Sequence, residues 1–186
     1  MTTQLRLTTL LDTTDASAVA DYERAFFRGF ETATHNRLVR WLWEWDIGAE
    51  RLRTRIPYAD QKIWLVRNAR GEITDGVAVN VAMNAFQAGA YGFTLPDDLA
   101  GGENRRALCE FLTFFAIGDH ALADKRVLWR ELFDDLRTMG FTTALGTGSP
   151  KIFPIHRWMG AELITQTQIE GEQRNFLRFD LTKTRR

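Results

Sequence analysis

The sequence predicts one α/β domain built on a central mixed β-sheet that is flanked by helices. Residues 108–163 follow the order strand, helix, strand, short helix, which normally places two parallel strands around a helical crossover. Segments rich in β-branched and aromatic residues surround short turns within 62–83 and 161–181, and these predict antiparallel hairpins. The 186 residues contain no internal repeat or linker, and such a length buries roughly 70% of the unfolded surface around one core. A single domain over 1–186 is therefore expected.

The N-terminal third is expected to hold one strand and two helices. Residues 4–11 alternate in the manner of a strand, and 12–15 supply the turn and the N-cap of a helix over 16–32. A second helix is expected over 35–45. Residues four apart share a helix face, so Trp41 and Trp45 are expected on one face and Trp43 on another. Two of these tryptophans are then expected in the core and one half-exposed. The alternative is that one of them lines a substrate groove.

The middle of the chain is expected to be a polar loop followed by a hairpin. Arg51, Arg53 and Arg55 alternate in this loop, where they are either solvated or able to meet a phosphate or an acidic partner. The strands expected next, in order, are 62–68, 73–83 with a bulge at Gly76, and 90–95.

The C-terminal half is expected to alternate strands and helices. Glycines at 140 and 160 are the expected helix stops, and Ser149 is the expected N-cap before Pro150. The expected elements are a strand over 108–117, an amphipathic helix over about 125–139, a strand over 142–146, a short helix from Pro150, and a closing hairpin of 161–169 and 173–181.

Composition argues against several classes of protein. Lysine plus arginine equals aspartate plus glutamate at 24 each, so no net field favours a nucleic acid or an acidic membrane. No apolar run approaches the roughly 18 residues of a membrane span, and the first residues lack the pattern of a secretory signal. A soluble, cytoplasmic protein with no nucleic-acid partner is therefore expected.

Cysteine and histidine usage bears on the chemistry. The one cysteine, Cys109, lies in an apolar strand, where a small buried hydrophobe is expected rather than a nucleophile. His35, His120 and His156 are far apart and lack carboxylate or cysteine partners at ligand spacing. No metal site is expected.

The order of the expected elements, β-α-α-β-β-(β)-β-α-β-α-β-β, resembles that of the GNAT superfamily of N-acyltransferases over nearly the whole chain. The most specific local match is Pro-Ile-His-Arg-Trp-Met-Gly-Ala-Glu-Leu at 154–163, which is similar to the family's short helix ending in Tyr-x-x-x-Gly-Phe. Gly160 takes the glycine position and His156 the tyrosine position. The resemblance implies that His156 protonates the departing thiolate, since an ordinary imidazole titrates near pH 6.5. The alternative is a histidine that only packs at the helix end.

The chain departs from the family at the loop that holds the pyrophosphate of CoA. The family has Arg/Gln-x-x-Gly-x-Gly/Ala there, whereas residues 120–125 are His-Ala-Leu-Ala-Asp-Lys and lack both glycines. Lys125 and Arg126 still bring positive charge to the helix start, where a phosphate could be held. His120 is either a contact to the donor or a solvated turn residue. The donor site that the resemblance implies consists of Ala116, Ile117, His120, Ala123, Lys125, Arg126 and Ser149.

A branch of the family fits this departure better. Acyl-homoserine-lactone synthases and N-acyl amino acid synthases have a long N-terminal helical region and take acyl groups from acyl carrier protein. Their strand motif Glu-x-Ser-Arg-Phe-Ala-Val is similar to 109–117, with Glu110 matching the acid and Thr113-Phe114 replacing Ser-Arg. Glu110 is the best candidate for the base, because an apolar strand should raise its pKa or supply a partner. The alternative is a carboxylate paired with Arg105 or Arg106.

Two classes of function follow from the resemblance. The first is an N-acyltransferase that moves an acyl group from acyl-CoA or acyl carrier protein to a small-molecule amine, without a metal. The second is a non-catalytic GNAT-like module that has lost its CoA loop and binds a ligand or a partner. Another reaction of acyl thioesters on the same fold, such as decarboxylation, stays open because a fold does not determine a function. A homodimer is compatible with either class.

Overall fold

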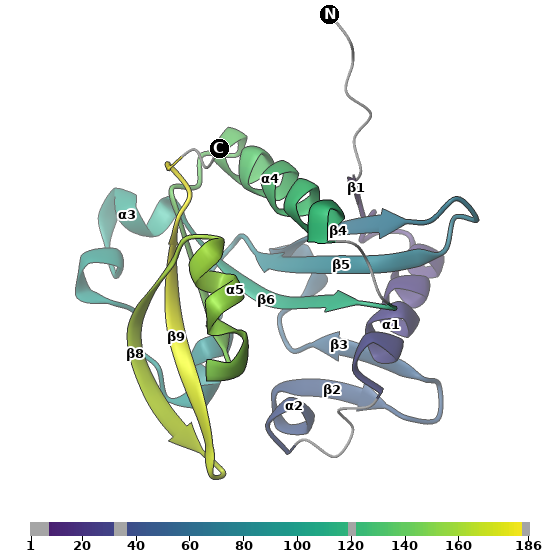
Figure 1. The fold of residues 1–186 in the computed structure, drawn as a ribbon, viewed down its shortest axis with the longest axis horizontal. Helices are drawn as coiled ribbons and strands as arrows, with labels where there is room; N and C mark the ends of the chain where they lie inside the picture. The colour runs from purple at the N-terminus through teal and green to yellow at the C-terminus, as the bar shows by residue number, and fades with distance from the viewer. Residues whose placement is uncertain (1–7, 32–36, 119–121, 184–186) are drawn as a thin grey trace, which may run out of the picture.

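A seven-stranded mixed sheet forms the centre of the protein (Figure 1). The computed structural model describes residues 8–31, 37–118 and 122–183, to which all structural statements refer. Neighbouring strands are antiparallel except β6 and β7, which are parallel. The order across the sheet is β1 (Thr8–Leu10), β4 (Gln61–Arg67), β5 (Ile73–Asn80), β6 (Leu108–Ala116), β7 (Thr143–Gly148), β9 (Glu172–Asp180) and β8 (Ala161–Ile169).

Helices cover both faces of this sheet (Figure 1). One face carries α1 (Ala16–Phe30), α2 (Arg37–Leu42) and a separate hairpin of β2 (Trp43–Asp46) and β3 (Arg51–Thr54). The other face carries α4 (Leu122–Thr138) and α5 (Phe153–Trp158). The connections contain the short helices η2 (Tyr58–Asp60), η3 (Gln87–Tyr91), η4 (Asp97–Leu99), α3 (Gly102–Arg106) and η5 (Pro150–Ile152).

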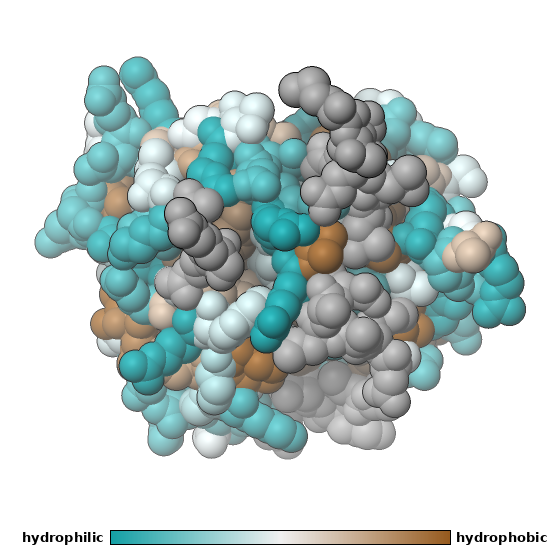
Figure 2. Space-filling view, turned by 45° about the horizontal axis from the view of Figure 1, so that its top comes forward, coloured by the Kyte–Doolittle hydropathy of each residue, from teal (hydrophilic) through white to brown (hydrophobic). Residues whose placement is uncertain are grey.

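Alternation along the strands produces two apolar clusters, one on each face. Tyr22, Phe26 and Phe115 belong to the cluster under α1. Leu132 and Phe179 belong to the cluster under α4. Hydrophilic residues cover much of the face drawn in Figure 2, and hydrophobic residues reach it in separate groups. The mixed α/β sheet flanked by helices is therefore confirmed.

The N-terminal helix follows its sequence signals, but the next segment does not. Asp15 caps α1 by accepting hydrogen bonds from the backbone N–H groups of residues 17 and 18, at 2.8 and 3.2 Å. The helix expected over 35–45 is wrong beyond residue 42, because 43–46 pair with 51–54 as a hairpin. Trp43 of β2 is buried, at 6% exposed, whereas Trp41 at the end of α2 is 52% exposed. The expected pairing of Trp41 with Trp45 on one buried face is therefore wrong.

The three alternating arginines lie in or beside β3 rather than in a solvated loop. Arg51 is ion-paired with the buried carboxylate of Glu23 on α1. Arg53 is ion-paired with Glu44 of β2 at 2.6 Å, and Arg55 donates to a backbone carbonyl of α2 at 3.2 Å. The contacts of Arg51 and Arg55 join this region to α1 and α2, and the Arg53 pair lies within the hairpin. The alternative of a phosphate contact therefore loses its support.

Two details of the middle strands also differ from expectation. Residues 90–95 do not form a strand, and the short helix η3 overlaps the start of this segment. The bulges lie at Val66/Arg67 and Ala78/Val79 instead of Gly76. Gly76 has another role, because a Cβ there would lie 2.4 Å from the ring of Phe115.

The C-terminal half agrees with the sequence. The pairing of β6 with β7 is parallel, with α4 as the crossover, and β8 and β9 form the closing hairpin. Gly140 ends the segment after α4 with a φ of 93°, a conformation that favours glycine.

Candidate functional site

The two parallel strands of the sheet separate partway along their length. The pairing of β6 with β7 covers four residue pairs, from Leu108↔Thr143 to Phe111↔Gly146. Beyond Phe111, β6 stays paired with β5 as far as Ala116, while β7 stays paired with β9 as far as Gly148. The register shift opposite Ala78 and Val79 leaves Leu112 as the additional residue of β6. A gap between β6 and β7 is the result.

This gap holds a cavity of about 60 Å³ on the α4 side of the sheet. Its walls are mainly aromatic and aliphatic, with a few polar groups. The lining residues are Phe111, Leu112, Thr113 and Phe114 of β6, Gly146 and Thr147 of β7, Trp129 of α4, His156 of α5, and Leu177 and Phe179 of β9. We call this cavity the β6–β7 gap.

His156 forms one wall of the β6–β7 gap. Its ring lies against Gly148, where a Cβ would come within 2.6 Å of Cε1, and meets the ring of Phe179 edge-on at 6.0 Å. Its Nδ1 is buried without a hydrogen-bond partner among the described residues. Burial lowers the pKa of His156 to about 4. The imidazole is therefore neutral near pH 7, unlike the ordinary imidazole assumed from the sequence, and offers one N–H donor and one acceptor.

Thr113 is a second polar group in the gap, and sequence reasoning did not assign it a role. Its side chain is 7% exposed, and its Oγ1 has no hydrogen-bond partner in the described part of the chain. Buried polar atoms are nearly always paired, so an unpaired one in a cavity needs an explanation. Its position as a single hydroxyl in an apolar strand was the available signal. Thr113 Oγ1 and His156 Nδ1 are therefore two buried polar atoms without a partner on residues that line the gap.

Several residues expected to hold the donor lie at the end of β6 or at the start of α4. Ala116 is the last residue of β6, and the backbone N–H of Ile117 donates to Thr74 at 2.8 Å. Lys125 is half-buried in α4, and the guanidinium of Arg126 lies 4.9 Å from the ring centroid of Trp158 on α5. This contact links the two helices beside the gap.

Three further members of that set are less informative. Ala123 lies in the first turn of α4, and His120 lies outside the described residues. Ser149 occupies the N-cap position of η5 with Pro150 directly after it, as expected. Its hydroxyl does not cap the helix, so the capping role is not what the structure contains.

Glu110 lies on the opposite face of the sheet from His156. Its side chain is 1% exposed and accepts hydrogen bonds from the backbone N–H groups of Gln87 at 2.9 Å and Ala88 at 2.8 Å, and from the amide of Asn80 at 3.3 Å. Burial raises the pKa of Glu110 to about 7, although these bonds oppose the shift.

The contacts of Glu110 differ from the pairing with Arg105 or Arg106 that the sequence left open. Arg105 donates to the carbonyl of Met83 at 2.9 Å instead of pairing with Glu110. The carboxylate therefore anchors the start of η3, and its pKa suits a base that works near neutral pH. Cys109, next to it, is fully buried with a raised pKa caused by burial, which confirms the expectation of a buried hydrophobe.

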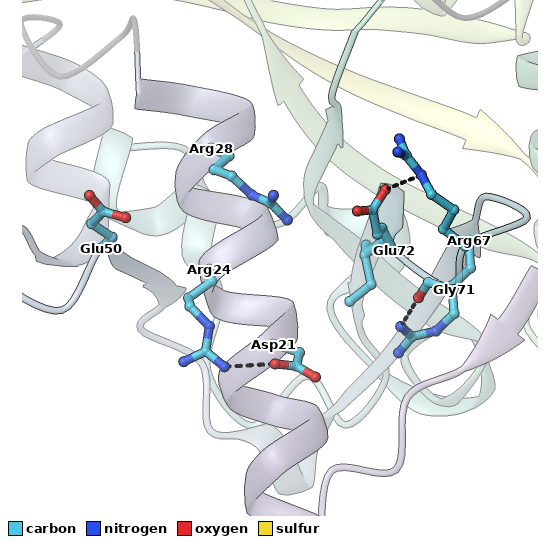
Figure 3. A pocket seen from close by; sticks show the side chains of 9 residues that line it. Asp21, Arg24, Arg28, Glu50, Arg67, Gly71 and Glu72 are labelled. Atoms are coloured by element: carbon cyan, nitrogen blue, oxygen red, sulfur yellow. Dashed lines mark hydrogen bonds and ion pairs between the residues drawn. The ribbon is translucent and has the colours of Figure 1, made fainter.

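A larger cavity lies elsewhere, between α1 and the β4–β5 hairpin (Figure 3). It measures about 420 Å³ and is lined almost entirely by charged side chains. Arg24 is paired with Asp21 at 2.6 Å, and Arg67 donates to the carbonyl of Gly71 at 2.7 Å. These contacts are open to solvent, and acyl transfer needs a site that excludes water. The β6–β7 gap fits that chemistry better.

Two features are absent from the described residues. Among them, no group of three His, Cys, Asp or Glu side chains is arranged to hold a metal ion. No helix within the described ranges is long and apolar enough to cross a membrane.

The fold is shared with solved synthases of acylated products. No family model and no curated protein matches the sequence. The AHL synthase LasI matches with a TM-score of 0.68 at 12% identity, over 94% of this chain and 88% of that one. BjaI, a CoA-dependent acyl-homoserine lactone synthase solved with SAM and isopentyl-CoA, gives 0.69 at 11% identity, over 92% and 80%. FeeM, an N-acyl amino acid synthase from uncultured soil microbes, gives 0.62 at 9% identity, over 96% and 97%.

At these identities the similarity shows the fold. The chain has a GNAT-like fold, and the matching structures include the acyl-homoserine-lactone synthases and the N-acyl amino acid synthase whose branch the sequence resembled.

Proposed function

We propose that this chain, which has the GNAT-like fold of these acyl-transferring synthases, is an N-acyltransferase that moves an acyl group from a thioester donor to a small-molecule amine. The observation that carries the proposal is the β6–β7 gap. It combines apolar walls with two unpaired buried polar atoms, Thr113 Oγ1 and His156 Nδ1. A thioester needs both, because its acyl chain is apolar and its carbonyl accepts hydrogen bonds.

The gap suits the electrophilic half of the reaction. Beyond Phe111, the edge of β6 that faces β7 has no ladder partner among the described strands. Its backbone N–H groups can therefore donate to the oxyanion that develops on the thioester carbonyl. Because His156 is neutral, it acts by donating a hydrogen bond to the carbonyl or to the departing sulfur. It does not act as a charged acid.

Glu110 suits the nucleophilic half. The amine nitrogen attacks the thioester carbon, a C–N bond forms, the C–S bond breaks, and one proton must leave the nitrogen. A carboxylate with a pKa of about 7 can accept that proton near neutral pH. Glu110 and His156 lie on opposite faces of the sheet. The amine therefore approaches the gap from the η3 side, and the donor approaches it from the α4 side. Solvent then returns the proton to the thiolate.

Positive charge near the start of α4 suits a donor that carries phosphate. Lys125 and Arg126 lie beside the gap, and CoA and the phosphopantetheine of a carrier protein both present phosphate groups there. The missing glycines at 120–125 weaken the case for tight binding of CoA.

The experiment presents both kinds of donor. The full chain is incubated with acyl-CoA and acyl carrier protein substrates of several chain lengths, together with a mixture of amino acids and S-adenosylmethionine. Free thiol is measured with a colorimetric reagent, and products are identified by mass spectrometry. Release of thiol matched by an acceptor that gains the acyl mass is expected. Absence of thiol release with every donor and acceptor would sink the proposal.

A second candidate is a binding module without catalysis. The observations that favour it are the loop without glycines and the neutral His156. The same donors then stabilise the protein, by about 2.7 kcal/mol at 100 times the dissociation constant, without releasing thiol. A thermal shift measured beside the thiol assay separates the two functions.

A further inference from the structure

Aromatic rings form much of the wall of the β6–β7 gap. Phe111 of β6 meets Trp129 of α4 edge-on at 5.6 Å and stacks on Phe133 at 6.0 Å, with 10° between the ring planes. Phe179 of β9 meets Phe111 at 5.0 Å from the other side. Phe114 lies 5.4 Å from Trp129 nearer the surface. The rings leave the gap with only about 60 Å³.

That volume limits what the gap can hold. A water-sized group needs about 15 Å³ of such space, so the gap accommodates about four groups of this size. The carbonyl of a thioester uses about half of them. Space for a few carbon atoms remains.

Two polar side chains line the same cavity as the rings. These are Thr113 and His156, whose Oγ1 and Nδ1 are buried without a partner among the described residues. An acyl group in this cavity therefore lies among Phe111, Trp129 and Phe179. A longer chain could be accommodated only if one of those rings moved.

Trp129 is the ring whose removal opens the gap most directly. Phe111 and Phe179 belong to the paired strands β6 and β9, and each touches several other rings. Trp129 comes from α4, is 9% exposed, and touches Phe111, Phe114 and Phe133. Its truncation leaves the ladder of the sheet intact while it frees space between α4 and β6.

We propose that the protein takes a donor with a short acyl group, of about two to four carbons, and that Trp129 sets this limit. The inference rests on the proposed function and names the donor class of the same site. Trp129 is then a specificity-determining residue.

The test is a chain-length profile. Thiol release is measured with acetyl-, butyryl-, hexanoyl- and octanoyl-CoA, and with the same acyl groups on a carrier protein. The full chain is compared with Trp129→Ala and with the milder Trp129→Leu, which keeps the protein measurable if the alanine variant does not fold. Trp41→Ala is the matched control, since Trp41 is 52% exposed and does not line the gap.

The expected result is a kcat/KM for the acetyl or butyryl donor at least tenfold above that for the octanoyl donor. Either Trp129 variant should shift this ratio at least tenfold toward the octanoyl donor, and Trp41→Ala should leave it unchanged. An unmodified protein that uses the octanoyl donor as well as the acetyl donor overturns the inference and leaves the proposed function standing. A profile unaffected by both Trp129 variants overturns the role of Trp129. Absence of thiol release at every length overturns the proposed function and the inference with it.

Discussion

Glu110 of β6 is buried and His156 of α5 is half-buried, and the surroundings of these two titratable groups are opposite. Three donors hold the carboxylate of Glu110 on the η3 side. On the α4 side, Nδ1 of His156 has no partner among the described residues. Burial favours the neutral form of each, so the pKa of Glu110 rises to about 7 and the pKa of His156 falls to about 4.

The hydrogen bonds of Glu110 are thus already made within the protein, whereas Nδ1 of His156 has no partner among the described residues. The bonds of Glu110 come from residues 80, 87 and 88, so this side chain orders the segment after β5 whether or not it is also a base. His156 orders no segment through Nδ1, and a ligand in the gap could supply its partner. Four predictions test or sharpen this contrast.

The largest effect is expected from Glu110→Gln. The amide keeps the shape of the side chain but cannot take a proton from the amine. Its one oxygen can accept from only one of the N–H groups of Gln87 and Ala88, which bind different oxygens of the carboxylate, so some loss of stability is also expected. Turnover should fall about 10²- to 10⁴-fold, the usual contribution of a general base, in the thiol-release assay.

The matched control is Glu23→Gln, which alters a buried carboxylate bound by Arg51 and Tyr58 on the same side of the sheet. It should lower stability without a comparable loss of turnover. If Glu110→Gln retains full turnover while it melts earlier, Glu110 is an anchor of the loop and not a base.

The second prediction concerns how stability depends on pH. The pKa of Glu110 is raised from 4.5 to about 7, so its contribution to stability is present below pH 4.5 and is lost as the pH rises toward 7. The pKa of His156 is lowered from 6.5 to about 4, so its contribution is present above pH 6.5 and is lost as the pH falls toward 4. Between pH 4.5 and 6.5 the two groups therefore change the free energy of unfolding in opposite directions as the pH rises.

Single variants should reveal each slope in urea unfolding between pH 4 and 8. In His156→Phe, the free energy of unfolding should fall by up to about 3 kcal/mol between pH 4.5 and 7, since each pH unit contributes at most about 1.4 kcal/mol per group. In Glu110→Gln, it should rise from pH 4 to 6.5 by less, because the ring of His156 is only partly enclosed. Slopes of the same sign in both variants would contradict the assignment.

The third prediction compares two glycines that make room for a ring. A Cβ at Gly148 would lie 2.6 Å from His156, and a Cβ at Gly76 would lie 2.4 Å from Phe115 under α1. Alanine at either position should cost about 1–3 kcal/mol of stability, as overpacking usually does. Turnover should fall only in Gly148→Ala, because the displaced ring there lines the gap. An equal loss of turnover in Gly76→Ala would show that the effect is general destabilisation.

The smallest effect is expected from Arg126→Ala. This change removes the guanidinium over Trp158 and one positive charge beside the gap. An exposed ion pair contributes about 0.2–1 kcal/mol, so loss of this charge should raise the KM for a phosphate-bearing donor about 1.5- to fivefold with kcat unchanged. Arg106→Ala, an exposed arginine of α3, is the control. A fall in kcat would point to a role closer to the reacting atoms.

Sequence reasoning was reliable where structure depends on neighbours along the chain. The periodicity of α4, the stops at Gly140 and Gly160, the cap at Asp15 and the closing hairpin are local signals, and the structure contains each of them. The GNAT-like order of elements depends on those signals. It could therefore be predicted, together with Glu110 and His156 as candidates.

Tertiary structure decided what depends on distant partners. Residues 43–46 became a strand because 51–54 pair with them, which no periodicity within 35–45 could indicate. The hydrogen-bond donors of Glu110 include the backbone N–H groups of residues 87 and 88. Burial against β7 and β9 lowers the pKa of His156 below its ordinary value. The β6–β7 gap exists because each of its strands follows a different neighbour. Local sequence thus determined which elements form, and only their packing determined which of their side chains are paired, which are neutral, and how much space the site has.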